Sequence, residues 1–138
     1  MTPKDLVEAE CARRGRPAFV EGCARLVAGD YDDVGLIRAL APRGSAKYFD
    51  GRPHDDEYWF RVWGMRGLLW AWEDSATAAL TTGAADEHWR VREMTAKVVA
   101  RHLVDAALPE VDRLREDPVP RVRAAAERAV AALTNAGA

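Results

Sequence analysis

Residues 117–130 read Asp-Pro-Val-Pro-Arg-Val-Arg-Ala-Ala-Ala-Glu-Arg-Ala-Val. An Asp-Pro turn is followed by apolar residues at helical spacing, which is typical of the start of an amphipathic helix. Two earlier segments align with the centre of this stretch without gaps, Phe-Arg-Val-Trp-Gly-Met at residues 60–65 and Trp-Arg-Val-Arg-Glu-Met at residues 89–94. The copies are offset by 29 and 31 residues, a period that indicates stacked helical repeats.

The three copies place apolar residues on one side of the same type of helix, because such residues recur at steps of three and four. The side chains predicted to form the core of this stack are Val62, Met65, Leu69, Val91, Met94, Val98, Val122, Ala129 and Leu133. Shorter amphipathic segments at residues 75–82 and 104–115 join the copies. Each copy is therefore one helical hairpin, which buries its apolar stripe by stacking on a neighbour.

The stretch 117–130 resembles the second half of a HEAT repeat, especially the short variety of phycobilisome-lyase-like proteins, in which an Asp-Pro turn, a Val-Arg pair and small residues open the inner helix. The resemblance covers residues 56–136 and is weakest in the first copy, where Trp63 replaces the arginine and Glu57 stands at the aspartate position. HEAT repeats imply an all-α fold, here a short right-handed α-solenoid with a concave inner surface. The family consists chiefly of scaffolds and binding modules, so the resemblance implies no activity.

The chain of 138 residues has the length of one domain. Residues 57–136 are the predicted HEAT-like repeats, and residues 42–56, with two prolines and two glycines, are the one long loop. Residues 1–41 have helical patterning but match the repeat poorly, so we expect them to form a degenerate N-terminal cap. Within this cap, Thr2-Pro3 and Pro17 open the first two helices, and Asp30 is the expected N-cap of the third.

Composition argues against several classes of protein. Hydrophobic residues make up 49% and charged residues 30%, and no apolar run approaches the roughly 20 residues that span a bilayer. The first residues carry charge and lack the apolar segment of a secretory signal, so we expect a cytoplasmic protein. Cys11 and Cys23 are expected to be free, and the sequence suggests neither a metal site nor a cofactor.

Aromatic residues concentrate in the first copy. Five tryptophans occur in the chain, and four of them fall within residues 59–72. Because Trp and Arg are favoured anchors at interfaces, the candidate residues for binding a protein partner are Trp59, Trp63, Arg66, Trp70 and Arg92. The alternative is that the indoles fill the junction between the regular stack and its cap, with Tyr48 and Phe49 of the loop folded over them.

A second set of candidates is basic. Equivalent or neighbouring positions of the inner helices carry Arg61, Arg90, Lys97, Arg101, Arg121 and Arg128. Stacked helices would place these side chains in a ladder with steps of about 8–10 Å. The ladder is either an ordinary solvated face or a site for an anion, which would be an acidic protein segment or a phosphate backbone. The net charge of −2 opposes a polyanion.

Other charged residues have structural explanations. Arg92 and Arg123 belong to the Val-Arg pairs and are expected to pair with Asp86, Asp117 or neighbouring repeats. His102 occupies the position that holds a leucine in the last copy and is expected in the core or at an interface between repeats.

One resemblance keeps catalysis open. Residues 89–94 are similar to repeat openings in HEAT-like DNA glycosylases of alkylation repair, which use concave-face aromatics and an aspartate. Trp70 and Asp74 have a suitable spacing, but those enzymes are longer and basic, and Asp74 also fits a helix cap.

We therefore expect a non-catalytic helical-repeat scaffold or module that binds a protein partner through its concave face. The alternatives are a nucleic-acid-binding or repair protein that uses the basic ladder, and a structural subunit whose tryptophans pair with a second copy.

Overall fold

The computed structural model describes residues 1–137, which are helical as the periodicity predicts and contain no strand. The α-helices in this part of the chain are α1 (Pro3–Arg14), α2 (Arg16–Val27), α3 (Val34–Leu40), α4 (Tyr58–Trp70), α5 (Thr77–Ala84), α6 (Trp89–His102), α7 (Leu108–Leu114) and α8 (Pro120–Ala136). Short 3-10 turns lie in the loop before α4 and directly before α5 and α7.

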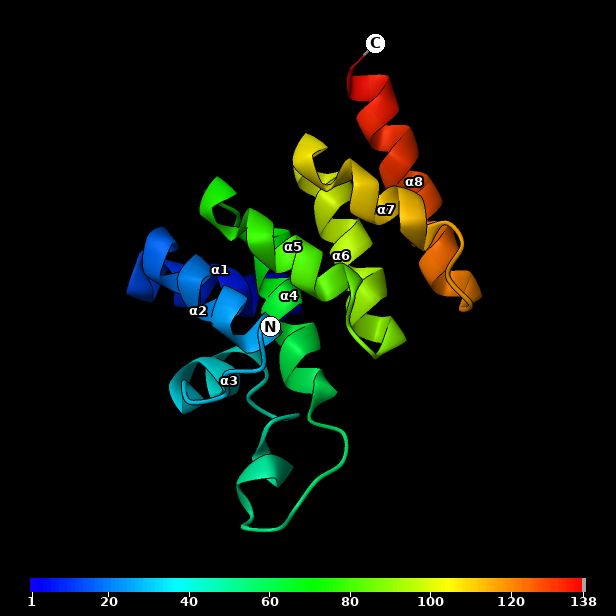
Figure 1. Ribbon diagram of the computed structural model, residues 1–138. Coiled ribbons are helices and arrows are strands. Elements are labelled where there is room, and N and C mark those ends of the chain that lie inside the picture. The colour runs from blue at the N-terminus through cyan, green and yellow to red at the C-terminus, as the bar shows by residue number, and fades with distance from the viewer. Residues whose placement is uncertain (138) are drawn as a thin grey trace.

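The even-numbered helices form one layer in which α2, α4, α6 and α8 pack against one another in chain order. Helices α5 and α7 lie in front of this layer in Figure 1, where α5 packs on α6 and α7 packs on α8. At the N-terminal end, α1 contacts α2 and α3, and α3 also contacts α4. The side of α6 and α8 that faces away from α5 and α7 is therefore left for the surface, whereas α1, α3 and the loop before α4 cover part of the corresponding side of α4.

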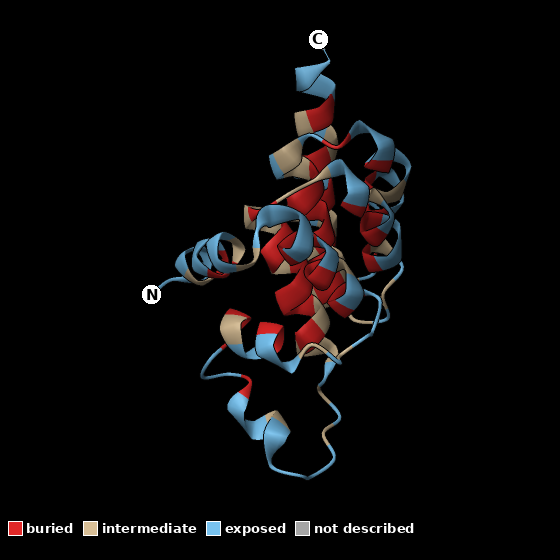
Figure 2. Ribbon diagram, turned by 90° about the vertical axis from the view of Figure 1, so that its left-hand side faces the viewer, coloured by how far each residue is buried: buried red, intermediate tan, exposed pale blue. Residues whose placement is uncertain are grey.

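The predicted core positions lie mostly between the two layers, where Figure 2 shows the buried residues gathered. Seven of the nine are buried, and Leu69 and Met94 are the two that are only half-buried, packed at the edge of the core. In α4 it is Leu68 that is fully buried, with 0% of its surface exposed. Gly64 and Gly67 let α4 approach α2 closely.

The approach of α2 and α4 depends on Gly64 and Gly67. A Cβ atom on Gly64 would lie 2.9 Å from the main-chain oxygen of Cys23 and 2.8 Å from the Cβ of Leu26. A Cβ atom on Gly67 would collide with the Cys23 sulfur. Cys23 is fully buried, and burial raises the pKa of its thiol, which leaves it an inert part of the core.

The N-cap of the third helix is Asp33, so the sequence prediction of Asp30 was wrong. The helix begins at Val34, and the Asp33 carboxylate accepts a hydrogen bond of 2.9 Å from the Leu36 N–H. Asp30 instead accepts a bond of 3.0 Å from the Asp32 N–H, which keeps residues 30–32 in a turn. Asp33 is held in place by Arg14 of α1, whose guanidinium donates to both carboxylate oxygens.

The loop of residues 42–56 folds against the start of α4. Tyr48 packs edge-on against Phe60 and Trp63, with ring centroids 4.7 and 6.2 Å apart, and its hydroxyl donates to the main-chain oxygen of Asp56. Phe49 turns away and lies under the guanidinium of Arg38 instead. Of the two aromatic residues of the loop, only Tyr48 covers the tryptophan cluster.

Candidate functional site

Two arginine–aspartate pairs join successive helices with the same geometry. Arg61 of α4 donates from Nε to Asp86 at 2.7 Å and from Nη2 at 3.2 Å, and Arg92 of α6 makes the same two bonds, with the same lengths, to Asp117. Each aspartate also caps the turn that follows it, since Asp86 accepts from the His88 N–H and Asp117 from the Val119 N–H. These pairs tie α4 to the turn before α6, and α6 to the turn before α8.

These two ion pairs give structural roles to Arg61 and Arg92, which the sequence predicts as candidate binding residues. Arg92 also donates to the main-chain oxygen of Asp86, and only 14% of its side chain is exposed. Arg61, 16% exposed, fills the role that Trp63 vacates in the first copy, and it donates further to the Tyr31 hydroxyl. Arg61 and Arg92 are therefore engaged in holding the helices together. The expected ladder of Arg61, Arg90 and Arg121 does not form as a set of three free cations.

The tryptophan cluster is divided by burial. Trp63 is 7% exposed beneath Tyr48 and belongs to the core. Trp59 and Trp70 are half-buried at the surface, at opposite ends of the same face of α4. The structure thus separates one covered indole from two indoles that reach the surface.

The surface indoles carry cations on their ring faces. Arg90 places its guanidinium 5.1 Å from the ring centre of Trp59 and 4.5 Å from that of Trp89. Arg121 lies 5.0 Å from the same Trp89 ring, so cations and indoles alternate from α4 through α6 to α8. Such contacts between a cation and an aromatic face hold the guanidinium in a defined orientation. Trp89 was not among the candidates, although it opens the second repeat copy.

A similar contact closes the other end of this surface. Arg101 of α6 lies 4.5 Å from the ring centre of Trp70, and Lys4 of α1 lies 5.5 Å from it. Trp59 with Arg90 and Trp70 with Arg101 are both separated by 31 residues, which sets the alignment of α4 with α6. The same separation relates Arg66 to Lys97 and Lys97 to Arg128, and from this alignment we infer that the three residues follow one another in a row on α4, α6 and α8.

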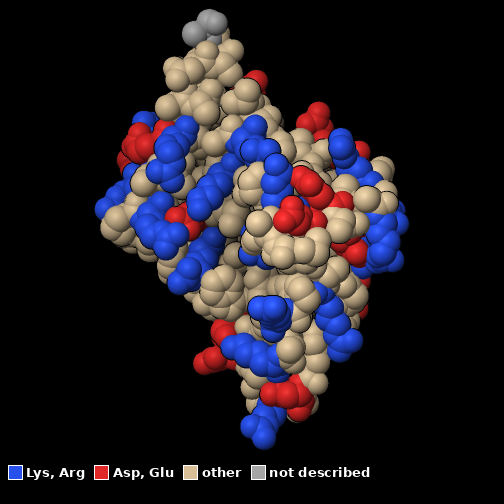
Figure 3. Space-filling model, turned by 180° about the vertical axis from the view of Figure 1, so that it is seen from behind, with Lys and Arg blue, Asp and Glu red and all other residues tan. Residues whose placement is uncertain are grey.

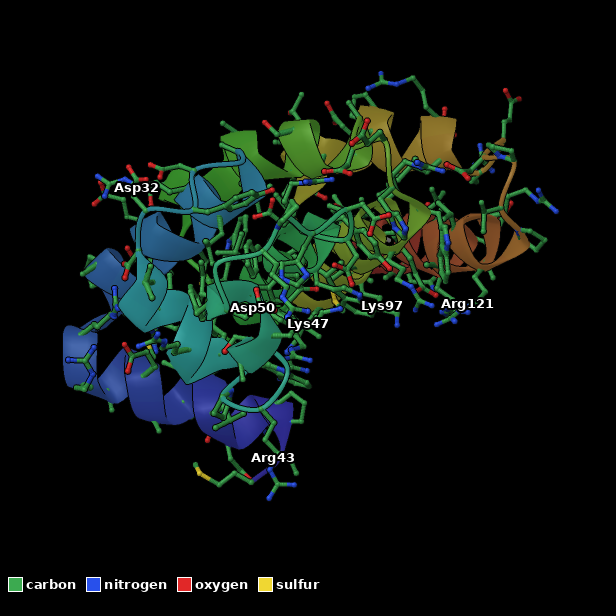
Figure 4. All side chains as sticks on the ribbon, turned by 90° about the horizontal axis from the view of Figure 1, so that it is seen from below. Asp32, Arg43, Lys47, Asp50, Lys97 and Arg121 are labelled. Atoms are coloured by element: carbon green, nitrogen blue, oxygen red, sulfur yellow. The ribbon has the colours of Figure 1, made fainter. Side chains whose placement is uncertain are left out.

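We call this surface the arginine–tryptophan face. Its residues are Trp59, Arg66, Trp70, Trp89, Arg90, Lys97, Arg101, Arg121 and Arg128. Figure 3 shows basic side chains gathered on this side of the molecule, and Figure 4 shows Lys97 and Arg121 pointing out on the same side. Among the described residues, Lys97, Arg101 and Arg128 have no acidic partner, whereas Arg121 forms two hydrogen bonds to Glu93.

Arg66 has an unusual environment for an arginine. Its Nη2 donates to the main-chain oxygen of Leu40 at 3.2 Å, while its Nε is buried and has no partner among the described residues. Burial lowers the pKa of the guanidinium below its ordinary value, because no carboxylate lies close enough to offset the loss of water. The side chain lines a cavity of about 450 Å³ whose wall includes Leu6, Pro42 and Arg43.

Histidine side chains serve the fold. His88 stacks flat on Tyr58, with ring centres 3.5 Å apart, and its Nδ1 accepts a hydrogen bond from the Arg90 N–H at the start of α6. His102 points its Nε2 at the main-chain oxygens of Leu68 and Leu69, at 2.9 and 3.0 Å, and caps the end of α4. Within residues 1–137, no group of three or more potential ligands is placed to hold a metal ion.

Trp70 and Asp74, the two residues with glycosylase-like spacing, make separate contacts. The Asp74 carboxylate accepts a hydrogen bond of 3.2 Å from the Trp72 indole N–H, and its main-chain oxygen accepts one from Thr77. Trp70 is engaged by Arg101 and Lys4 instead.

Comparison of the chain with models of protein families, with curated proteins and with solved structures finds no match. In the part of the chain that the structure describes, no helix has both the length and the apolar character needed to cross a bilayer.

Proposed function

We propose that this chain is a short right-handed α-solenoid of HEAT-like repeats, and that it acts as a non-catalytic module that binds a protein partner. The repeated contacts of Arg61 with Asp86 and Arg92 with Asp117 support the repeat assignment, because equivalent atoms join successive inner helices. The partner-binding surface in this proposal is the arginine–tryptophan face, the outward side of the inner helices.

One observation carries the binding role. The face combines half-buried indoles with cations that have no acidic partner among the described residues, and Arg90 is held between two of the rings. Tryptophan and arginine supply much of the affinity at protein interfaces, and groups already held in position lose less entropy on binding. The candidate set changes accordingly: Trp59, Arg66 and Trp70 stay, whereas Trp63 and Arg92 are taken up inside the fold.

Affinity capture with a matched pair of charge-reversed variants tests this proposal. The test variant is Lys97→Glu/Arg128→Glu, and the control is Arg52→Glu/Arg113→Glu, whose exposed residues lie off the face. Each variant lowers the net charge by four, from −2 to −6. We expect the wild type and the control to capture the same proteins from the native cell, and the test variant to lose them. Equal capture by both variants would reject the face as the binding surface.

A nucleic-acid-binding function is the second candidate, favoured by the row of Arg66, Lys97 and Arg128 across three adjacent helices. If this row contacts phosphates, the affinity for duplex DNA falls steeply with salt, by a log–log slope of about −0.9 for each phosphate neutralised. The absence of binding at about 50 mM salt, where such contacts are strong, would remove this candidate.

A further inference from the structure

We propose that the arginine–tryptophan face binds an extended acidic peptide segment, whose carboxylates lie along the row of Arg66, Lys97 and Arg128. This inference rests on the proposed binding function and adds the chemical class of the partner. It follows from the charges on the face, from the state of its indoles and from the environment of Arg66.

The charge on the face is almost entirely positive. Glu93 lies next to these cations, is 8% exposed and already accepts two hydrogen bonds from Arg121, and Glu8, at the Trp70 end, pairs with Lys4. The remaining cations have no carboxylate partner among the described residues, although the chain as a whole carries more acidic than basic residues. A local patch of uncompensated positive charge attracts and orients an anionic segment.

The indoles distinguish an acidic peptide from a nucleic acid. Single-stranded nucleic acids bind by stacking bases on free aromatic faces. Here Trp59, Trp89 and Trp70 each carry at least one cation on the ring, and Trp89 and Trp70 each carry two. Few ring faces are left for bases. The contacts instead fix Arg90 and Arg101 in position, and a fixed guanidinium is well suited to a planar carboxylate.

Arg66 supplies an anchor at one end of the row. Its guanidinium is largely withdrawn from water and has one hydrogen bond, to the Leu40 oxygen. A buried cation without a counter-charge is unfavourable, and a bound carboxylate would provide that charge. The adjacent cavity of about 450 Å³ has apolar walls at Leu6 and Pro42, so it accepts part of an apolar side chain beside the acid.

The spacing of the row also fits an extended chain. Neighbouring packed helices are about 8–10 Å apart, and alternate side chains of an extended peptide repeat at about 6.6–6.8 Å. Lysine and arginine side chains are long and flexible enough to span the difference. A segment with acids at every second or third position would therefore meet Arg66, Lys97 and Arg128 in turn.

Fluorescence anisotropy with a defined probe tests this proposal. The probe is a labelled peptide of alternating glutamate and serine about twelve residues long, a length that covers the row when extended. We expect it to bind the wild type and the control Arg52→Glu/Arg113→Glu, and to bind Lys97→Glu/Arg128→Glu about tenfold more weakly or worse. The same peptide with glutamine in place of glutamate should not bind measurably.

An Arg66→Met variant tests the anchor separately. It keeps the approximate length of the side chain. The loss of the bond to the Leu40 oxygen is offset by the removal of a desolvated charge without a counter-charge, so we expect a weaker affinity for the glutamate peptide with a nearly unchanged melting temperature. A fall in melting temperature with the affinity unchanged would show that Arg66 is only structural, and would overturn its role as an anchor.

The other outcomes also decide the question. Equal binding of the glutamate and glutamine peptides, or no binding of either, would overturn the acidic class of partner. Tighter binding of an oligonucleotide with the same number of charges would overturn it in favour of nucleic acid. The proposed function has its own measurement, because partner capture by the two charge-reversed variants does not use the peptide. Loss of capture without peptide binding would leave the binding module in place and remove only the acidic segment.

Discussion

The interface of α2 with α4 and the interface of α6 with α8 solve the same packing problem in different ways. Between α2 and α4, Gly64 and Gly67 bring the two backbones together around Cys23, and no ion pair joins these two helices in residues 1–137. Helices α6 and α8 bury mainly small side chains, among them Val98, Ala126 and Ala129, and Arg121 of α8 bonds to Glu93 of α6.

The difference shows how each region keeps its register. Valine and alanine fit many offsets, so the C-terminal helices need the bidentate bond of Arg92 to Asp117 to select one. In the N-terminal region close packing sets the offset between α2 and α4. A side chain at Gly64 or Gly67 of α4 would collide with α2, so only glycine fits at these two positions. Tyr48 and Phe60 then close the irregular space around Trp63. Substitutions in the two regions should therefore fail for different reasons.

The largest expected effect is that of Val98→Asp in the regular region. Val98 is 0% exposed, and an unpaired buried carboxylate costs several kcal/mol, against a total stability of roughly 5–15 kcal/mol. We expect loss of the cooperative thermal transition, measured by circular dichroism at helix wavelengths. The neighbouring Lys97→Asp is the control and should fold normally, because Lys97 lies at the surface without a partner among the described residues. A folded Val98→Asp protein would contradict the stacked core.

Trp63→Ala should destabilise the irregular region, because the substitution leaves a cavity in the core. Trp63 is 7% exposed and packs against Phe60 and Tyr48, so truncation should lower the free energy of unfolding by about 3–5 kcal/mol. Denaturant titration measures this value. Trp59→Ala on the same helix is the matched control, and we expect it to cost less because Trp59 is half-buried. Equal losses of unfolding free energy for the two variants would show that the cover provided by Tyr48 does not make Trp63 more important for stability than Trp59.

The two regions also differ in how far the sequence predicts them. The sequence motif recurs because each copy must bury the same apolar stripe, and this regularity predicted the helices and most of the core. A periodic pattern does not predict that Arg61 bonds to Asp86 in the copy where Trp63 replaces the arginine, because this bond depends on where the side chains point. The packing of Tyr48 on Trp63 likewise joins residues of an aperiodic loop and a helix.

The sequence likewise predicted only part of the arginine–tryptophan face. Arg90, Lys97 and Arg128 were recognised because they recur at repeat positions, and Arg101 because it lies near Lys97 on the same helix face. The offset that aligns α4 with α6 is 31 residues at the face, whereas the sequence copies align at 29. The row that begins at Arg66 was therefore not visible from the sequence alone.

Asp117→Asn should weaken the polar bond on which the regular region depends. The Asp117 and Arg92 side chains are 5% and 14% exposed, so loss of the charged hydrogen bonds should cost about 2 kcal/mol near neutral pH. Asp112→Asn is the control, since Asp112 is 55% exposed and its pair with Arg115 should contribute little. A loss no larger than that of the control would show that the C-terminal helices keep their register without this bond.

The same variant makes a prediction about pH. Burial by itself raises the pKa of Asp117, but the hydrogen bonds from Arg92 and from the Val119 N–H outweigh it, and the pKa lies below its ordinary value. A carboxylate with a lowered pKa stabilises the fold above its unfolded-state pKa of about 3.9, and that contribution is lost as the pH falls through the folded-state value. The gap between wild type and Asp117→Asn should be full at about pH 6 and narrow below about pH 4.

The smallest effect should appear in fluorescence quenching, which compares the covered and the surface indoles directly. Trp63 is buried, whereas Trp59, Trp70 and Trp89 reach a face rich in unpaired cations. At low ionic strength this positive field attracts iodide and repels caesium ions, because charges are screened only beyond a distance of about 10 Å or more. We expect iodide to quench the wild type more strongly than caesium does, and a fraction of the emission to resist both ions. Lys97→Glu/Arg128→Glu should reduce the iodide effect while leaving quenching by neutral acrylamide unchanged, and Arg52→Glu/Arg113→Glu should leave both nearly unchanged. Equal quenching by iodide and caesium in the wild type would mean that the face has no net positive field, and the charge argument for an acidic partner would then fail.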